Sequence, residues 1–113
     1  MGEDEVFAPG DALRNLEILC VDSDSQRGDA LRKLLLNLGA ARVQVVESAK
    51  EGIRAALGTS CNLVIAEYRL TPTDGIQFVR DIRTVANYPR ALLPVLIVSD
   101  PERSEIIGAA CGS

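Results

Sequence analysis

The stretch Asn62-Leu-Val-Ile-Ala-Glu-Tyr-Arg-Leu-Thr-Pro-Thr-Asp-Gly75 decides how this chain folds. Residues 63–66 form a short apolar run, which is typical of a strand buried on both faces. The run ends in the carboxylate of Glu67, and turn residues up to Gly75 lead into a helical pattern. In an open parallel sheet the ligand crevice lies at the carboxyl ends of the strands, so this stretch predicts a functional group at a strand end.

Strand-like runs and helical patterns alternate along the rest of the chain. The expected strands cover residues 16–21, 42–46, 62–66 and 93–98, and helices are expected after each of them, the third at about 73–86 and the last at about 101–110. Short connections between such elements predict a parallel sheet with helices on both faces. The apolar spacing assigns these residues to the inward faces of the first three helices: Ala30, Leu31, Leu34, Leu35 and Leu38; Ile53, Ala56 and Leu57; Ile76, Val79, Ile82 and Ala86.

Helix boundaries are marked by capping residues. The cluster Asp22-Ser23-Asp24-Ser25 can cap the first helix, which is expected to stop at Gly39. Ser48 and Glu51 have the spacing of a capping box at the start of the second helix, which is expected to stop at Gly58.

Length and composition restrict the class of protein. A chain of 113 residues suffices for one domain, and its net charge of −4 argues against nucleic acid or an anionic membrane as the main partner. No apolar run approaches 20 residues. The three cysteines, Cys20, Cys61 and Cys111, lack metal or redox spacing, which favours reduced thiols in a cytoplasmic protein. The absence of histidine excludes histidine-based acid–base catalysis and a phosphohistidine role.

Polar side chains follow three of the expected strands. Asp22 follows the first strand, Glu67 the third and Ser99 the fourth. If these strands are neighbours, the two carboxylates converge and need a proton or a cation between them, for which Mg²⁺ is the natural candidate. Alternatively, Asp22 and Ser99 are helix caps and Glu67 is a surface carboxylate. We favour a shared site because all three residues fall at strand ends.

From Leu16 onward the chain resembles the receiver domain of two-component response regulators. The matching stretches are Ile-Leu-Cys-Val-Asp-Ser at 18–23, the quoted run at 62–75 and Pro-Val-Leu-Ile-Val-Ser at 94–99. The resemblance implies an α/β, flavodoxin-like doubly wound sheet with strand order 2-1-3-4-5. It also implies a non-enzymatic module of a phosphorelay, partnered by a histidine kinase or another signalling protein.

In that family an acidic pair and a third-strand aspartate hold Mg²⁺, and the aspartate accepts a phosphoryl group. By resemblance, Asp22 matches the first acid and Ser23 stands at the second. Glu67 stands at the phosphoacceptor position and Ser99 at the switch hydroxyl. The implied metal ligands are Asp22, Glu67 and the backbone carbonyl of Arg69. The family's fifth-strand lysine has no counterpart, since the only lysines, at 33 and 50, lie in early helical segments.

These departures predict weak Mg²⁺ binding and poor phosphorylation. Glutamate moves its carboxylate outward by about 1.5 Å relative to aspartate, and Ser23 removes a negative charge from the metal site. The leading hypothesis is therefore a pseudo-receiver that acts through protein–protein interaction. Glu67 either imitates a phosphorylated aspartate or fills a disused site. A working phosphoacceptor and a structural or dimerisation domain of a longer protein remain as alternatives.

The expected domain organisation is a tail at 1–15 and a receiver-like domain at 16–113 that lacks the family's last strand and helix. Without a fifth strand, the edge of the fourth, Val95–Val98, is unpaired and apolar. We expect self-association through this edge, or a longer chain that supplies the missing strand.

Overall fold

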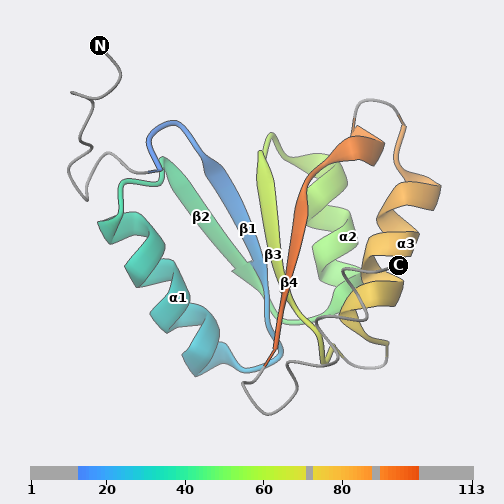
Figure 1. Ribbon diagram of the computed structural model, residues 1–113, viewed down its shortest axis with the longest axis horizontal. Helices are drawn as coiled ribbons and strands as arrows, with labels where there is room; N and C mark the ends of the chain where they lie inside the picture. The colour runs from blue at the N-terminus through green and yellow to red at the C-terminus, as the bar shows by residue number, and fades with distance from the viewer. Residues whose placement is uncertain (1–12, 71–72, 88–89, 100–113) are drawn as a thin grey trace, which may run out of the picture.

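Four parallel strands form a single sheet with the order β2-β1-β3-β4 (Figure 1). The computed structural model describes residues 13–70, 73–87 and 90–99. The strands are β1 (Glu17–Val21), β2 (Arg42–Val46), β3 (Leu63–Glu67) and β4 (Val95–Val98). The predicted class and strand order are therefore confirmed, and the predicted bounds differ by at most two residues at any end.

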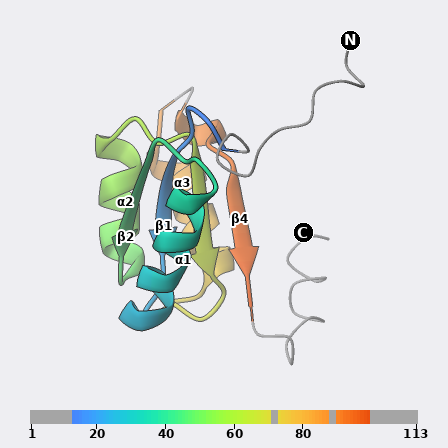
Figure 2. The same cartoon turned by 90° about the vertical axis from the view of Figure 1, so that its left-hand side faces the viewer.

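Helices cover both faces of the sheet. Helix α1 (Ser25–Asn37) lies on one face, while α2 (Ala49–Gly58) and α3 (Gly75–Val85) lie on the other (Figures 1 and 2). A 3₁₀ turn, η3 (Arg90–Leu92), precedes β4. The helix expected at 101–110 lies outside the described residues. No helix in the described ranges has both the length and the apolar character needed to cross a bilayer.

Side-chain caps begin α1, α2 and α3. Asp24 accepts hydrogen bonds from the backbone N–H groups of Gln26 and Arg27 at the start of α1. Ser48 caps α2 and Asp74 caps α3 in the same way. Helix α1 ends as predicted before Gly39, whose φ of 101° lies in the region that glycine adopts without strain.

The core has two layers because successive side chains of a strand point to opposite faces of the sheet. Toward α2 and α3, the strand residues Val21 and Val64 pack with Phe78 and Ile82. Toward α1, the other strand positions pack with Leu35 in a smaller cluster: Ile18, Cys20 and Ile65. Leu13, which the sequence assigns to the tail, packs against this second cluster.

Several residues predicted to face inward do not. Ala30 is exposed and Leu34 is 53 % exposed, because Leu35 takes the buried position in the run of three leucines. Leu57 is 41 % exposed beside the fully buried Ala56.

In α3 the buried stripe runs through Gly75, Phe78 and Ile82. Ile76 and Val79 are only partly buried, so the helix is rotated relative to the prediction. Ala86, just after the helix, packs against the core as predicted. A Cβ at position 75 would lie 2.9 Å from the carbonyl oxygen of Glu67, and this close approach fixes which face of α3 turns inward.

Candidate functional site

Asp22 and Glu67 lie side by side at the carboxyl edge of the sheet. Strands β1 and β3 are paired with Val21 opposite Ala66, so the residue that follows each of these lies at the same edge. The backbone N–H of Asp22 donates to Val46 at 3.0 Å and continues the sheet's hydrogen bonding. Both residues are buried, with 5 % and 8 % of their surface exposed. They are the only buried charged residues in the described ranges, and buried carboxylates need a compensating charge.

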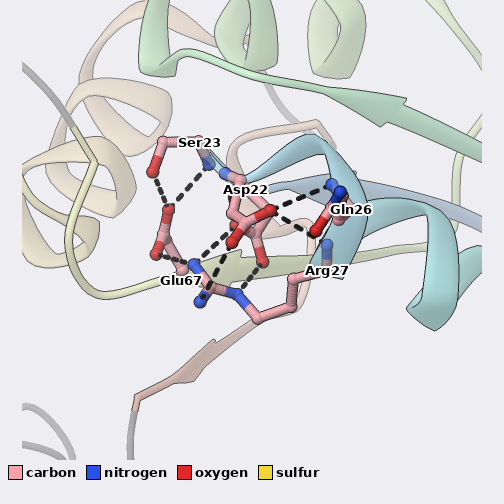
Figure 3. Close-up of polar contacts among 6 residues, drawn as sticks. Asp22, Ser23, Gln26, Arg27 and Glu67 are labelled. Carbon is pink, nitrogen blue, oxygen red and sulfur yellow. Dashed lines mark hydrogen bonds and ion pairs between the residues drawn. The ribbon is translucent and has the colours of Figure 1, made fainter.

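That charge comes from Arg27, in the first turn of α1 (Figure 3). Its Nε donates to Asp22 Oδ2 and its Nη2 to Asp22 Oδ1, both at 2.8 Å, which is a bidentate pair. The same Nη2 donates to Glu67 Oε1 at 2.7 Å. One guanidinium group therefore pairs with both carboxylates and offsets one of their two negative charges. Its contact with Asp22 raises the pKa of Arg27 above its ordinary value.

Ser23 bonds the remaining oxygen of Glu67. Its backbone N–H donates to Glu67 Oε2 at 2.7 Å, and its hydroxyl donates to the same oxygen (Figure 3). On the other carboxylate, Asp22 Oδ1 also accepts the backbone N–H of Asp24 at 2.9 Å. All four carboxylate oxygens thus accept hydrogen bonds from the protein itself.

Arg27 is the residue that sequence reasoning missed. Its only signal is position: it lies five residues after Asp22, in the first turn of a helix, where a cation opposes the helix dipole. An arginine there needs nearby carboxylates, and it has three, since its Nη1 also lies 3.9 Å from Asp24 Oδ2.

Cys20 lies two residues before Asp22 in β1 and is fully buried. Burial, together with the negative charge of Asp22, raises the pKa of its thiol to about 11. A thiol with such a pKa stays protonated near neutral pH. Cys20 therefore acts as a small core residue.

A cavity of about 290 Å³ opens beside the carboxylate pair. It is lined by Ser23, Arg27, Glu67, Arg69 and Ser99, among others. Pairing of Glu67 with Val98 places Ser99 one residue further along this edge. Of the predicted site residues, Glu67, Ser99 and Arg69 share the cavity, while Asp22 is connected to it through Arg27.

The backbone of α1 packs closely against a β2 side chain next to Arg27. A Cβ added at Gly28 would lie 2.7 Å from Val45 Cγ1, so only glycine lets the first turn of α1 approach β2 this closely. The side chain of Arg27, itself 49 % exposed, thereby reaches both strand ends.

In this arrangement the residues do not fit a divalent cation. No group of three or more cysteine, aspartate or glutamate residues within 13–70, 73–87 and 90–99 is placed to hold a metal ion. An incoming ion would also have to displace Arg27 from both carboxylates.

Comparison with solved structures identifies the fold. No family model matches the sequence. A response regulator receiver protein from Pseudomonas putida is 26 % identical with a TM-score of 0.68, over 88 % of this chain and 81 % of its own. The receiver domain of the histidine kinase CKI1 from Arabidopsis thaliana, complexed with Mg²⁺ and BeF₃⁻, is 19 % identical with a TM-score of 0.72, over 90 % and 80 % of the two chains. The chain therefore has the fold of response regulator receiver domains, and the predicted resemblance is confirmed.

Proposed function

We propose that this chain is a pseudo-receiver, a non-enzymatic signalling module of a two-component phosphorelay that acts through protein–protein contacts with little or no phosphorylation. One observation carries the proposal: both oxygens of Glu67, at the position of the phosphoacceptor, are engaged by Arg27 and Ser23. A carboxylate must present a free, aligned oxygen to attack phosphorus, and a misplacement of about 1 Å can cost about a hundredfold in rate.

The charges of the site support the same proposal. Phosphoryl transfer is catalysed mainly by positioned cations that offset the charge on the phosphoryl oxygens. Here the nearest cation, Arg27, is already paired with Asp22 and Glu67, and Ser23 stands where a second acid would hold Mg²⁺. Binding of Mg²⁺ by Asp22, Glu67 and the carbonyl of Arg69 is accordingly proposed to be weak.

Incubation with a small phosphodonor such as acetyl phosphate and Mg²⁺ tests the proposal. We expect no acid-stable, hydroxylamine-labile label on the wild-type chain, and the same result for Glu67→Gln. The exposed Glu47→Gln variant is the matched control for a general change in charge. Stoichiometric label on the wild type that is lost in Glu67→Gln alone would overturn the proposal.

The cavity beside Glu67 and Ser99 favours a second candidate, a working phosphoacceptor. It has room for a bound group, and Glu67 would be the acceptor and Ser99 the hydroxyl that contacts it. This candidate requires Arg27 to release Glu67, and it predicts saturable Mg²⁺ binding. A titration without a saturable site at millimolar Mg²⁺ would contradict it.

The proposed partners are a histidine kinase or another signalling protein, and a second copy of the chain. Among the described strands, β4 pairs only with β3. Leu96 is 54 % and Val98 38 % exposed, which leaves an apolar edge of the kind that pairs with another chain. A monodisperse monomer by sedimentation would exclude self-association. A cytoplasmic location belongs to the same proposal and accords with the free thiols of Cys20 and Cys61.

A structural or dimerisation role is the third candidate, and the same apolar edge favours it. In that case Glu67→Gln would leave both partner binding and signalling output unchanged. The pseudo-receiver predicts a change in at least one of them, because Glu67 joins β3 to Ser23 and Arg27 at the surface around the cavity.

A further inference from the structure

Two buried carboxylates share a single cation that belongs to the chain. Nη2 of Arg27 donates to Asp22 at 2.8 Å and to Glu67 at 2.7 Å, so an oxygen of each carboxylate lies around the same nitrogen (Figure 3). A divalent ion would take oxygen ligands from the same two groups. The guanidinium and the ion therefore compete for one place.

The position of Arg27 is poor for helix stability and good for this contact. It lies in the first turn of α1, where the unpaired N–H groups and the dipole favour anions. Arg32 and Lys33, one to two turns further along the helix, pair instead with Asp29 on the helix surface. Among the described residues, Arg27 is thus the only cation with an ion pair to Asp22 or Glu67.

We propose that Arg27 is a tethered counter-ion that replaces a metal ion, and that its removal exposes a latent divalent-cation site on Asp22 and Glu67. In the wild type the carboxylate pair shares a cation of the chain itself, so the fold around the cavity does not depend on Mg²⁺. The inference rests on the proposed function, because it explains why the same site binds Mg²⁺ weakly.

Substituting Arg27 removes the positive charge that competes with a divalent ion for the two carboxylates. The Arg27→Gln variant loses the positive charge and has a shorter polar side chain with an amide oxygen, which is a ligand that Mg²⁺ accepts. The carboxylates then face each other with no compensating charge, and a divalent ion relieves their repulsion. Arg54→Gln is the matched control, since Arg54 is an exposed arginine of α2 that does not line the cavity.

The experiment follows thermal unfolding of each variant at increasing MgCl₂ or MnCl₂ and constant ionic strength. A dissociation constant near 1 mM would raise the midpoint of Arg27→Gln by about 5 °C at 10 mM ion. We expect that rise to saturate in Arg27→Gln. We expect shifts below about 1 °C in the wild type, in Arg54→Gln, and in the double variants Asp22→Asn/Arg27→Gln and Glu67→Gln/Arg27→Gln.

Two results would overturn the inference. One is a saturable rise in the wild type as large as in Arg27→Gln. The other is a folded Arg27→Gln variant, with the circular dichroism of the wild type, whose midpoint does not respond to either ion. If Arg27→Gln does not fold without metal, refolding it at 10 mM Mg²⁺ gives the deciding result, and failure to recover there also counts against the inference. Label from a phosphodonor on the wild type would contradict the pseudo-receiver proposal, whatever the response to metal.

Discussion

Two arginines hold opposite ends of the same sheet, and they do so with different partners. At the carboxyl end, Arg27 joins α1 to β1 and β3 through two buried carboxylates. At the amino end, Arg90 in η3 joins β4 to α2 and β3 through neutral carbonyl groups. It donates to Ala56 O at 2.6 Å and to Cys61 O at 2.9 Å.

The difference lies in what remains when each arginine is removed. Without Arg90, two neutral carbonyl groups lose a donor that water can partly replace. Its Nε is also buried without a partner in the described part of the chain, so its contacts are not all favourable. Without Arg27, two buried negative charges lose their shared counter-ion. Arg90 therefore stabilises the fold, whereas Arg27 also determines the net charge of the site formed by Asp22 and Glu67.

The largest effect is expected for Arg27→Gln in metal-free buffer. The free energy of unfolding should fall by about 3 kcal/mol, because breaking a buried ion pair leaves uncompensated charge. Urea denaturation measures the loss, and the exposed control Arg54→Gln should stay within about 0.5 kcal/mol of the wild type. A loss below about 1 kcal/mol would mean that the half-exposed guanidinium contributes no more than a surface pair.

The second-largest effect is a loss of stability at alkaline pH. It tests whether the charge of Asp22 acts on the buried thiol of Cys20. The folded pKa of Cys20 is about 11, against an ordinary value of 9.0. A raised pKa contributes stability that is complete below pH 9 and is lost as the pH rises toward 11, by about 2–3 kcal/mol.

The measurement is the free energy of unfolding between pH 8 and 10.5 for the wild type and Cys20→Ala. The wild type should lose more stability with rising pH than the variant does. Parallel pH profiles would show that the Cys20 thiol contributes nothing to the alkaline loss. A smaller loss in Asp22→Asn would assign part of it to the carboxylate, which is the second cause of the shift after burial.

The third-largest loss of stability is expected for Arg90→Gln. We expect a loss of about 1–2 kcal/mol from the missing hydrogen bonds to Ala56 and Cys61. The loss should be the same with and without 10 mM Mg²⁺, in contrast to Arg27→Gln. A recovery of Arg90→Gln by Mg²⁺ would remove the distinction between the two ends of the sheet.

Ser23→Ala is expected to have the smallest effect, about 1 kcal/mol. The variant removes the hydroxyl donor to Glu67 Oε2, but the backbone N–H of residue 23 still bonds that oxygen. Chemical denaturation measures this loss, and the control is Ser60→Ala, which removes an exposed hydroxyl–carboxylate hydrogen bond to Glu17. A loss as large as that of Arg27→Gln would show that the hydroxyl, rather than the arginine, dominates the site.

The sequence predicts the fold well because its signals are local. Apolar runs, capping residues and Gly39 mark the strands and helices, and their alternation defines the sheet. The rotation of α3 is not predicted, because it depends on how closely Gly75 approaches the backbone of Glu67 in the folded chain.

The site is predicted only in part, because one of its contacts depends on tertiary packing. Strand order alone places Asp22 beside Glu67, and the sequence predicts that this pair needs a cation. The source of that cation is not predicted, because Arg27 and Glu67 are 40 residues apart and meet only through tertiary packing. By its sequence, Arg27 looks like any solvent-facing arginine on a helix. The roles of Glu67, Ser99 and the Arg69 carbonyl in phosphorylation or metal binding remain predictions.

A counter-ion that is part of the polypeptide has no dissociation equilibrium of its own. Chelators and dilution do not remove it, and the ionic composition of the surroundings does not set its occupancy. The charge that Arg27 supplies around Glu67 is therefore determined by the fold itself. It changes when α1 shifts against the sheet or when a residue is substituted.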